Sequence, residues 1–400
     1  MTGCRPAWIH PAFRLIEGED LFGWPELAGL AVPAGGVVLA DRPSRVLAAL
    51  AAAEAAGQGL LLARGAADPG GWQPGQGQGQ GQGFSVTLES SGTTGTPKRL
   101  RHEFDRLRGR LRGVEEEGAR WLLTYDPGAF AGLQVMLTAA AAGAQLVAVP
   151  GGASGGGGIA GLAEAARRHA VTHVSGTPSF WRAFLMALGD AGLPLRAVTL
   201  GGEAADQPLL DRLAERFPGA RLRHIYASTE AGALFAVADG RAGFPAAWLD
   251  DAPDGLSLRI VDGVLEVRSP RAAPGIADAD GWLSTGDLVE RQGDRLLFAG
   301  RLDGLVNVGG VKVSPEAVER LLLAVGGVAE AAVSALPSPI TGHLLTATIV
   351  PAAGSDLEVL RVALRAATAD LPPAARPRAL TFADHIPLSA AGKKSRKGAA

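Results

Sequence analysis

Cysteine is almost absent from this sequence, with Cys4 the only one among 400 residues. This excludes an intrachain disulfide framework and a metal centre held by cysteine thiolates. The 7 histidines are scattered and match no metal-ligand spacing, so we expect them to be structural. A reducing compartment fits this cysteine usage best, and we therefore expect a cytoplasmic protein.

Long apolar runs and a strong excess of one charge are also missing. No segment has about 18 uninterrupted apolar residues, the length needed to cross a bilayer. The N-terminus lacks a basic stretch followed by an apolar run. We therefore expect neither secretion nor integral membrane association. The formal net charge is -2 and the isoelectric point about 6.4, so no basic face for nucleic acid is predicted.

Lysine is scarce, although basic residues as a class are not. Of the 38 lysines and arginines only five are lysine: Lys98, Lys312, Lys393, Lys394 and Lys397. Most of the basic residues in this chain are therefore arginines. The compact ammonium group of lysine is not interchangeable with the guanidinium group of arginine. Each retained lysine is therefore a candidate for a specific role.

The length and the first ninety residues indicate an α/β protein with more than one domain. A chain of 400 residues exceeds the usual single-domain range of about 100 to 200. Apolar runs at 36–40 and 59–64 flank a helical segment at 44–56, which predicts a β-α-β unit. The Gly/Gln tract at 74–83 has nothing to bury and is predicted to be a flexible surface loop.

The pattern of elements changes twice after the tract. From residue 84 to 228 strands and helices alternate, which predicts a mostly parallel sheet with helices on both faces. Short strands with Gly and Asp turns from about residue 256 suggest a small β-barrel or antiparallel sheet. After Gly300 a helix opened by Ser314 and Pro315 begins a small α+β region.

We therefore predict an α/β large domain followed by a small α+β C-terminal domain. The large domain, residues 1–300, is expected to contain mixed, largely parallel sheets with helices and a small β-barrel-like subdomain. The small domain, residues 301–400, is expected to be mobile.

One loop stands out as a candidate phosphate site. A predicted strand leads into a segment rich in hydroxyls and glycine: Ser90, Ser91, Gly92, Thr93, Thr94, Gly95, Thr96, Pro97 and Lys98. It is not a P-loop, because Pro97 precedes the lysine and Arg99 follows it, so no hydroxyl stands where magnesium would need one. Backbone amides and hydroxyls of such a loop can still wrap polyphosphate oxygens, and a polar turn is the alternative.

The segment SSGTTGTPK resembles the signature loop of the adenylate-forming superfamily, which comprises acyl-CoA synthetases, amino-acid adenylation domains and luciferases. Further segments resemble that family's later motifs in the same order: YASTE (226–230), GWLSTGDL (281–288), GRLDGLVNVGGVKVSPEAVE (300–319) and PLSAAGKKSR (387–396). In the last motif Ser389 stands for threonine and Leu388 stands where a lysine is common. The resemblance covers about residues 84–396.

The resemblance implies an AMP-forming acid-thiol ligase. A carboxylate would attack the α-phosphate of ATP, releasing pyrophosphate and leaving an acyl-adenylate. The acyl group would then pass to the thiol of CoA or of a carrier-protein phosphopantetheine, releasing AMP. ATP, Mg²⁺ and the thiol carrier are the implied cofactors, and a small carboxylic acid and an acyl-carrier protein are the implied partners.

The resemblance also implies roles around the phosphates. Residues 90–98 would close over the β- and γ-phosphates, Thr229 would contact the α-phosphate and Glu230 would hold Mg²⁺. The catalytic lysine would be Lys393, whose ammonium stabilises charge in the transition state. The alternative is that Lys393 belongs to a solvated basic tail without a catalytic role. We interpret Lys394 and Lys397 as residues of such a tail.

Other implied roles concern the nucleoside. Tyr226 would stack on adenine, and the backbone of Gly202 and Glu203 would pass beside it. Asp287 would accept hydrogen bonds from the ribose hydroxyls, for which its two oxygens are suited. Arg301 would add a charged donor.

The hinge between the two domains is expected at Asp303, with residues 306–310 along a pantetheine path. The acid pocket is predicted to draw on Phe130, Ser175, Thr177 and Ala204. Fewer residues than usual precede the phosphate loop, so we expect a trimmed N-terminal part, with a more open pocket or an oligomer interface.

Three functions remain open. Besides the acid-thiol ligase, the chain could be an amino-acid adenylating enzyme loading a carrier domain, or a degenerate nucleotide-binding protein without catalysis. Tyr125 and Asp126 resemble the pair in which an aspartate binds an α-amino group. The interval from Gly132 to Gly143 instead fits acyl-CoA synthetases and puts Asp126 too far upstream. A simple carboxylic acid is therefore the favoured substrate.

Overall fold

The computed structural model describes residues 4–64, 84–90, 98–108, 116–152, 158–389 and 392–394. The Gly/Gln tract at 74–83 lies outside the described residues, and so do residues 91–97 of the glycine-rich loop. Among the described residues, none of the helices is both long and apolar enough to span a bilayer.

Eight strands form the largest sheet, in the order β12-β11-β10-β9-β7-β8-β1-β2. They are β1 (Arg14–Glu17), β2 (Asp20–Phe22), β7 (Arg120–Leu123), β8 (Gln145–Ala148), β9 (His173–Gly176), β10 (Ala197–Gly201), β11 (Arg221–Ser228) and β12 (Gly232–Val237). The central strands are parallel, and the edge strands β2 and β12 are antiparallel to their neighbours. The predicted mostly parallel sheet is thus confirmed.

A second sheet contains the strands around the glycine-rich loop. Its members are β3 (Gly36–Leu39), β4 (Leu60–Ala63), β5 (Ser85–Ser90) and β6 (Lys98–Glu103). The first three are parallel, as the predicted β-α-β unit requires, and β6 returns antiparallel to β5. The loop 91–97 therefore joins two paired strands, with Ser90 opposite Lys98.

Helices cover these sheets and bury the core. They are α1 (Trp24–Ala28), α2 (Pro43–Ala56), α3 (Phe104–Arg108), α4 (Phe130–Ala141), α5 (Gly158–Arg168), α6 (Pro178–Leu188) and α7 (Gln207–Arg216). Helix α6 packs firmly against the largest sheet, because Trp181 is fully buried and its indole donates to the Thr199 carbonyl at 2.9 Å. The N-terminus of this helix, which borders the site, is capped by Thr177, whose hydroxyl accepts from the Phe180 amide at 3.0 Å.

The third sheet is antiparallel, in the order β13-β17-β16-β15-β14. It is built from β13 (Phe244–Pro245), β14 (Ser257–Val261), β15 (Val264–Arg268), β16 (Leu283–Gln292) and β17 (Arg295–Arg301). The predicted change to short strands is confirmed. We call everything from β1 to β17 the main lobe.

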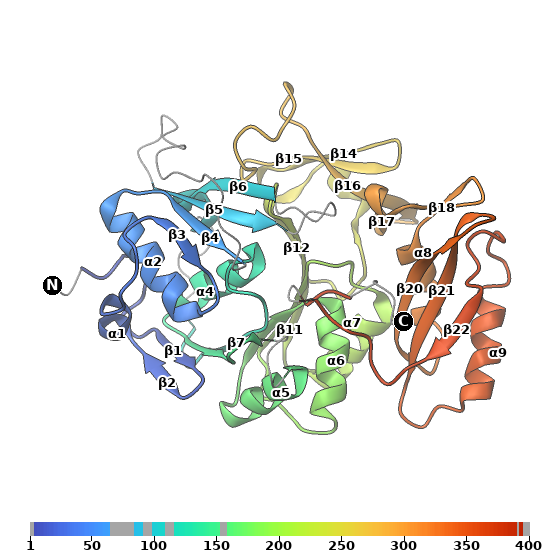
Figure 1. The fold of residues 1–400 in the computed structure, drawn as a ribbon, viewed down its shortest axis with the longest axis horizontal. Coiled ribbons are helices and arrows are strands. Elements are labelled where there is room, and N and C mark those ends of the chain that lie inside the picture. Colours follow the sequence, from blue (N-terminus) through green and yellow to red (C-terminus); the bar gives the residue numbers. More distant parts are fainter. Residues whose placement is uncertain are drawn as a thin grey trace.

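The C-terminal lobe comprises the elements after β17 and stands apart in the ribbon view (Figure 1). It contains β18 (Val306–Val308), β19 (Val311–Val313), α8 (Pro315–Leu323), β20 (Val328–Ser338), β21 (Gly342–Pro351), α9 (Leu357–Ala367) and β22 (Ala379–Phe382). Ser314 caps α8 by accepting from the Ala317 amide at 3.1 Å, with Pro315 next, as predicted. The tail after β22 runs back toward the main lobe (Figure 1).

The first strand is the main element that the sequence patterns missed. Residues 14–17 pair in parallel with 145–148 and extend the largest sheet. The strand has a charged residue at each end, Arg14 and Glu17, and only two apolar residues between them, so it lacks the apolar run that marked other strands, and its partner is distant in the chain. Tertiary pairing, not local pattern, defines this strand.

Candidate active site

Three adjacent parallel strands of the largest sheet end at one edge, where the site begins. The residues that follow them are predicted site residues: Thr177 after β9, Gly202 and Glu203 after β10, and Thr229 and Glu230 after β11. Because carboxyl ends of parallel strands meet at the same edge, folding brings these segments together.

The backbone of β16 is shaped to present Asp287. The Thr285 hydroxyl donates to the Leu265 carbonyl at 2.7 Å and accepts from the Asp287 amide at 3.1 Å. Gly286 adopts a φ of +71°, which side chains rarely tolerate, and a β-carbon there would lie 3.2 Å from Nη2 of Arg301. The threonine-glycine-aspartate order therefore has a local physical reason.

Asp287 joins a cluster of predicted nucleoside-binding residues. The Tyr226 hydroxyl from β11 donates to Oδ2 of Asp287, and Nη1 of Arg301 donates to Oδ1 at 3.1 Å. Arg301 also donates through Nε to Asp303 at 2.9 Å, in the short helical turn Leu302–Gly304. The predicted hinge residue is thus bonded directly to a predicted nucleotide contact.

Burial shapes the electrostatics of this cluster. It raises the pKa of Asp287, and the hydrogen bond from Tyr226 and the charges of Arg301 and Lys393 offset this only in part. Burial and the adjacent Asp287 carboxylate raise the pKa of Tyr226 well above its ordinary value, so the phenol remains a donor. A carboxylate with restricted hydration accepts hydrogen bonds strongly from polar ligand groups.

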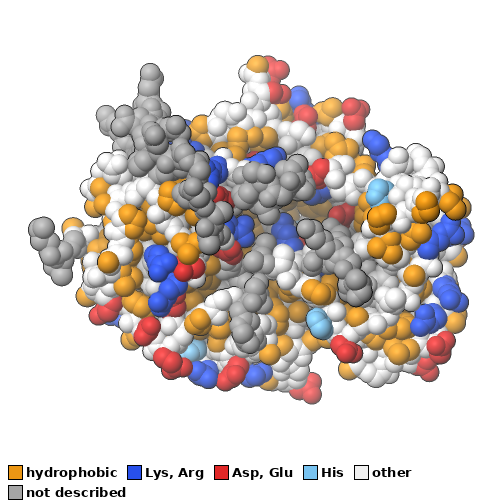
Figure 2. Space-filling view, in the orientation of Figure 1, with side chains coloured by type: hydrophobic (Ala, Val, Ile, Leu, Met, Phe, Trp, Pro, Cys, Tyr) orange, Lys and Arg blue, Asp and Glu red, His pale blue; other side chains and the backbone are white. Residues whose placement is uncertain are grey.

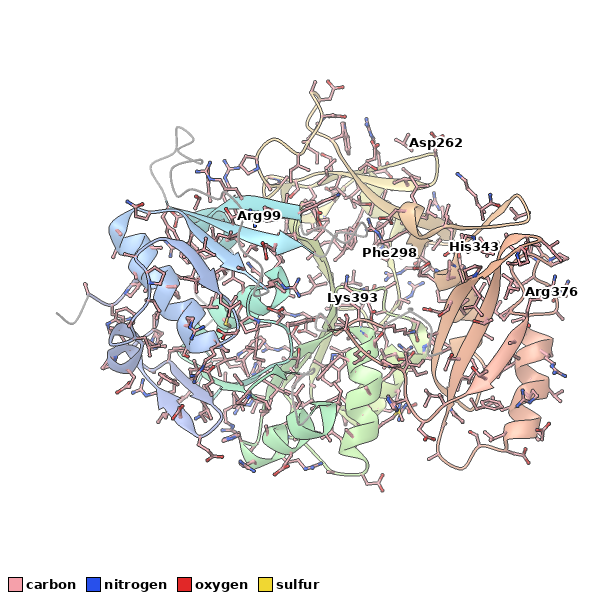
Figure 3. The ribbon with its side chains drawn as sticks, viewed as in Figure 1. Arg99, Asp262, Phe298, His343, Arg376 and Lys393 are labelled. Carbon is pink, nitrogen blue, oxygen red and sulfur yellow. The ribbon has the colours of Figure 1, made fainter. Side chains whose placement is uncertain are left out.

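Lys393 enters this region from the C-terminal tail and lies where the lobes meet (Figure 3). A β-carbon on Gly202 would lie 3.7 Å from Cε of Lys393. The tail is held by the Thr177 hydroxyl, which donates to the Gly392 carbonyl, and by Glu203, which accepts from the Lys394 amide at 3.4 Å. In the space-filling view the surface is hollowed between the two lobes (Figure 2).

Lys394 does not belong to a solvated tail, so our interpretation of this residue was wrong. Its side chain is only 7% exposed and Nζ lies 2.9 Å from Oε1 of Glu330. Pairing with buried carboxylates of the C-terminal lobe, which sequence spacing does not reveal, accounts for its burial. Lys397 lies outside the described residues.

Thr229 and Glu230 lie in the turn between β11 and β12, next to His102. Burial lowers the pKa of His102, and the Glu230 charge and a hydrogen bond with the Thr229 backbone oppose this only in part. The sequence motifs did not assign His102 to the site. Its position on β6, which continues from the glycine-rich loop, was the available signal.

Glu230 is also the predicted magnesium ligand. Within the part of the chain that the structure describes, no three His, Cys, Asp or Glu side chains are grouped closely enough to hold a metal ion. One carboxylate nevertheless fits Mg²⁺, which keeps several waters and is usually held by one or two carboxylates plus substrate phosphates.

The predicted acid-pocket residues fall into two places. Phe130, at the start of α4, and His102 line a cavity of about 30 Å³. Ser175 and Ala204 do not line that cavity, and Thr177 contacts the tail. Their assignment to an acid pocket therefore stays a prediction.

The glycine-rich loop is seen only at its ends. The predicted phosphate contacts Ser91, Gly92, Thr93, Thr94 and Gly95 lie outside the described residues. Ser90 ends β5, and Lys98 begins β6 on an exposed position.

Comparison with known families matches both lobes. Residues 86–275 match the family model of the AMP-binding enzymes, and residues 317–393 match that of the AMP-binding enzyme C-terminal domain. The two segments occur in the order that the sequence motifs indicated.

Curated relatives match over part of their length. The chain is 33% identical over 272 residues to an isonitrile lipopeptide synthase of Streptomyces coeruleorubidus, covering 60% of this chain and 18% of the relative. It is 31% identical over 239 residues to a p-hydroxybenzoic acid–AMP ligase of Mycobacterium tuberculosis, covering 54% of this chain and 34% of the relative. A 4-coumarate–CoA ligase-like protein of Arabidopsis thaliana is 29% identical over 227 residues, covering 51% and 40%. The chain thus spans less than half the length of these relatives.

Solved structures share the fold. MenE of E. coli, solved with bound OSB-AMS, superimposes with a TM-score of 0.66 at 21% identity, over 92% of this chain and 90% of that one. ATP-bound MatB of Rhodopseudomonas palustris gives a TM-score of 0.67 at 18% identity, over 96% and 94%. Motifs, family models and fold agree, and the chain belongs to the AMP-binding enzymes of the adenylate-forming superfamily.

Proposed function

We propose that the protein uses ATP to activate a carboxylic acid as an acyl-adenylate and then transfers the acyl group to a thiol. The observation that carries this proposal is the meeting of Lys393 with the cluster of Asp287, Tyr226 and Arg301. These four residues come from four separate motifs, and their assembly in one place supports a common ligand.

In the first half-reaction a carboxylate oxygen bonds to the α-phosphorus while the bond to pyrophosphate breaks. Asp287 would hold the ribose hydroxyls and Tyr226 would lie against the base. The Lys393 ammonium would stabilise the charge that develops around the α-phosphate. Thr229 would contact the same phosphate, and the loop 90–98 would cover the other two. Glu230 would hold Mg²⁺, which neutralises phosphate charge when bound.

In the second half-reaction the thiol sulfur attacks the acyl carbonyl carbon, the bond to AMP breaks and the thiol proton is released. We propose residues 301–400 as a mobile domain that turns about Asp303 between the two steps. The bond from Arg301 to Asp303 supports a coupling between nucleotide contacts and this turn. CoA and carrier-protein phosphopantetheine both suit such a step.

A simple acid is favoured over an amino acid because Asp126 is already engaged. Its Oδ2 lies 2.9 Å from Nε of Arg64, its Oδ1 accepts from the Gly128 amide at 2.8 Å, and its side chain is only 17% exposed. Arg64 already neutralises this carboxylate, so its charge is not available to pair with a substrate ammonium group. The named relatives include a p-hydroxybenzoic acid ligase and a 4-coumarate–CoA ligase-like protein, so aromatic acids are the first candidates.

We propose that the reaction takes place in the cytoplasm, with CoA or an acyl-carrier protein as acceptor. Several relatives are named as CoA ligases and one as a fatty acid–acyl-carrier-protein ligase, which supports both acceptors. Oligomer formation also remains a proposal.

An exchange assay over a panel of acids tests the function. We expect ATP–pyrophosphate exchange with at least one carboxylic acid, with p-hydroxybenzoate and 4-coumarate examined first, and none with amino acids. Exchange only with amino acids would contradict the simple-acid substrate and would favour an amino-acid adenylating enzyme that loads a carrier domain. No exchange with any acid would overturn the enzymatic function.

A further inference from the structure

Lys394, next to the proposed catalytic lysine, is anchored in the C-terminal lobe. Its ammonium donates to the Ala331 carbonyl at 2.7 Å and lies 2.9 Å from Glu330 and 3.5 Å from Glu319. Both glutamates are 6% exposed. Burial lowers the pKa of Lys394, but the charges of Glu319 and Glu330 outweigh this and raise it overall. The lysine therefore stays charged in its buried site.

Backbone hydrogen bonds and a bridge join the described residues 388, 389 and 392–394, which we call the turn. Leu388 pairs with Lys394 in an antiparallel bridge, the Ser389 amide donates to the Lys393 carbonyl at 2.7 Å, and the Gly392 amide donates to the Ser389 carbonyl at 2.8 Å. Successive side chains of extended backbone point to opposite faces. Anchoring Lys394 on one side thus directs Lys393 to the other, toward Gly202.

The anchor also contacts the main lobe. Oε1 of Glu330, which faces Lys394, lies 3.8 Å from Nε of Arg182 on α6. Arg182 is paired with Asp206, the N-cap of α7. The four side chains of this chain of charges are at most 10% exposed: Lys394, Glu330, Arg182 and Asp206. A buried charge without a partner is costly, so the stability of each charge depends on its neighbours. A continuous buried chain of charges runs from the tail into α6.

We propose that Lys394 is a positioning residue for adenylation. It fixes the turn to β20, so that its neighbour Lys393 enters the nucleotide site. Glu330, shared between Lys394 and Arg182, ties this arrangement to docking of the C-terminal lobe on α6. The inference rests on the proposed function, since it assigns Lys394 an effect on the first half-reaction through Lys393.

A double-mutant cycle tests whether Lys394 acts through Lys393. Lys394→Met keeps a long apolar chain without the charge and is expected to slow ATP–pyrophosphate exchange by about tenfold or more. The variant should have a lower kcat for exchange and nearly the same KM for ATP. Thioester formation from supplied acyl-adenylate should persist. In a Lys393→Ala background the same change should alter exchange by less than about twofold. Additive losses, or equal loss of both half-reactions, would overturn the proposal.

Two further variants separate positioning from general damage. Lys312→Met removes an exposed lysine from β19 of the same lobe and should leave exchange unchanged. The double variant Lys394→Met, Glu330→Gln removes one charge of each sign, while Arg182 keeps Asp206 and Glu319 keeps the hydrogen bond from the Val333 amide. We expect it to fold and still to lose exchange. Full exchange activity in this folded double variant would contradict the proposal.

Hydrogen exchange gives a readout that needs no substrate. In the wild type the amides of Ser389 and Gly392 are hydrogen-bonded within the turn. In Lys394→Met they should exchange with deuterium faster, while the amides of α9 keep their protection and show that the lobe is folded. Unchanged protection of the turn would refute the anchor. Wild-type protein that is inactive with every acid would refute the proposed function, whatever the hydrogen exchange shows.

Discussion

Replacing Lys393 by alanine is expected to slow acyl-adenylate formation by about 10²- to 10³-fold, the range typical for loss of one group that stabilises transition-state charge. The side chain of Lys393 lies beside Gly202, and its positive charge opposes the rise that burial causes in the pKa of Asp287. It therefore lies where the nucleotide is proposed to bind. Its removal takes away charge stabilisation but leaves the acid and thiol sites unchanged. Pyrophosphate exchange should collapse while thioester formation from supplied acyl-adenylate persists.

The matched control for this variant is Lys312→Ala, which removes another exposed lysine from the C-terminal lobe. It should keep both half-reactions. Equal loss of both half-reactions in Lys393→Ala would contradict the account in which the lobe carries different residues to the site in the two steps.

Replacing Asp287 by alanine is expected to lower kcat/KM for ATP by about 10²- to 10³-fold, because two charge-assisted hydrogen bonds to ribose hydroxyls would be lost. The carboxylate is held in place by Tyr226 and Arg301, so the wild type binds the diol without reorganising this group. The effect should appear mainly as a raised KM for ATP in the exchange assay.

Deoxynucleotides make the test of Asp287 specific. The wild type should discriminate strongly against 2′-deoxy-ATP, and Asp287→Ala should lose most of that discrimination. Asp294→Ala is the control, since Asp294 pairs with Arg241 on the surface and is 72% exposed. If Asp287→Ala still preferred ATP over 2′-deoxy-ATP as strongly as the wild type, the ribose assignment would be wrong.

Local patterns in the sequence were sufficient for most of the fold. The alternating segments from 84 to 228 became the strands and helices around β9, β10 and β11, because each carries a strong apolar period and clear turn residues. The pairing of residues 14–17 with 145–148 could not be foreseen, since nothing local specifies which strand lies next to which. Sheet order is decided by packing across the whole lobe.

The site could be predicted to a similar extent. The order of the motifs singled out Asp287 and Lys393, and the structure brings them close enough for the Lys393 charge to act on Asp287, while their roles stay predictions. Lys394 was misread, because a lysine in a charged tail looks the same in sequence whether it is solvated or paired with Glu330. The contact of Thr177 with Gly392 was also invisible, since it joins segments of two lobes.

Transfer of isotope from the acid tests the central claim most directly. An acid found in the exchange panel, labelled with ¹⁸O in its carboxylate, would be converted to thioester with ATP and CoA, and the nucleotide product analysed by mass spectrometry. Attack of the carboxylate on the α-phosphorus predicts AMP that carries one ¹⁸O atom. Unlabelled AMP, or label found in inorganic phosphate beside ADP, would contradict the acyl-adenylate account.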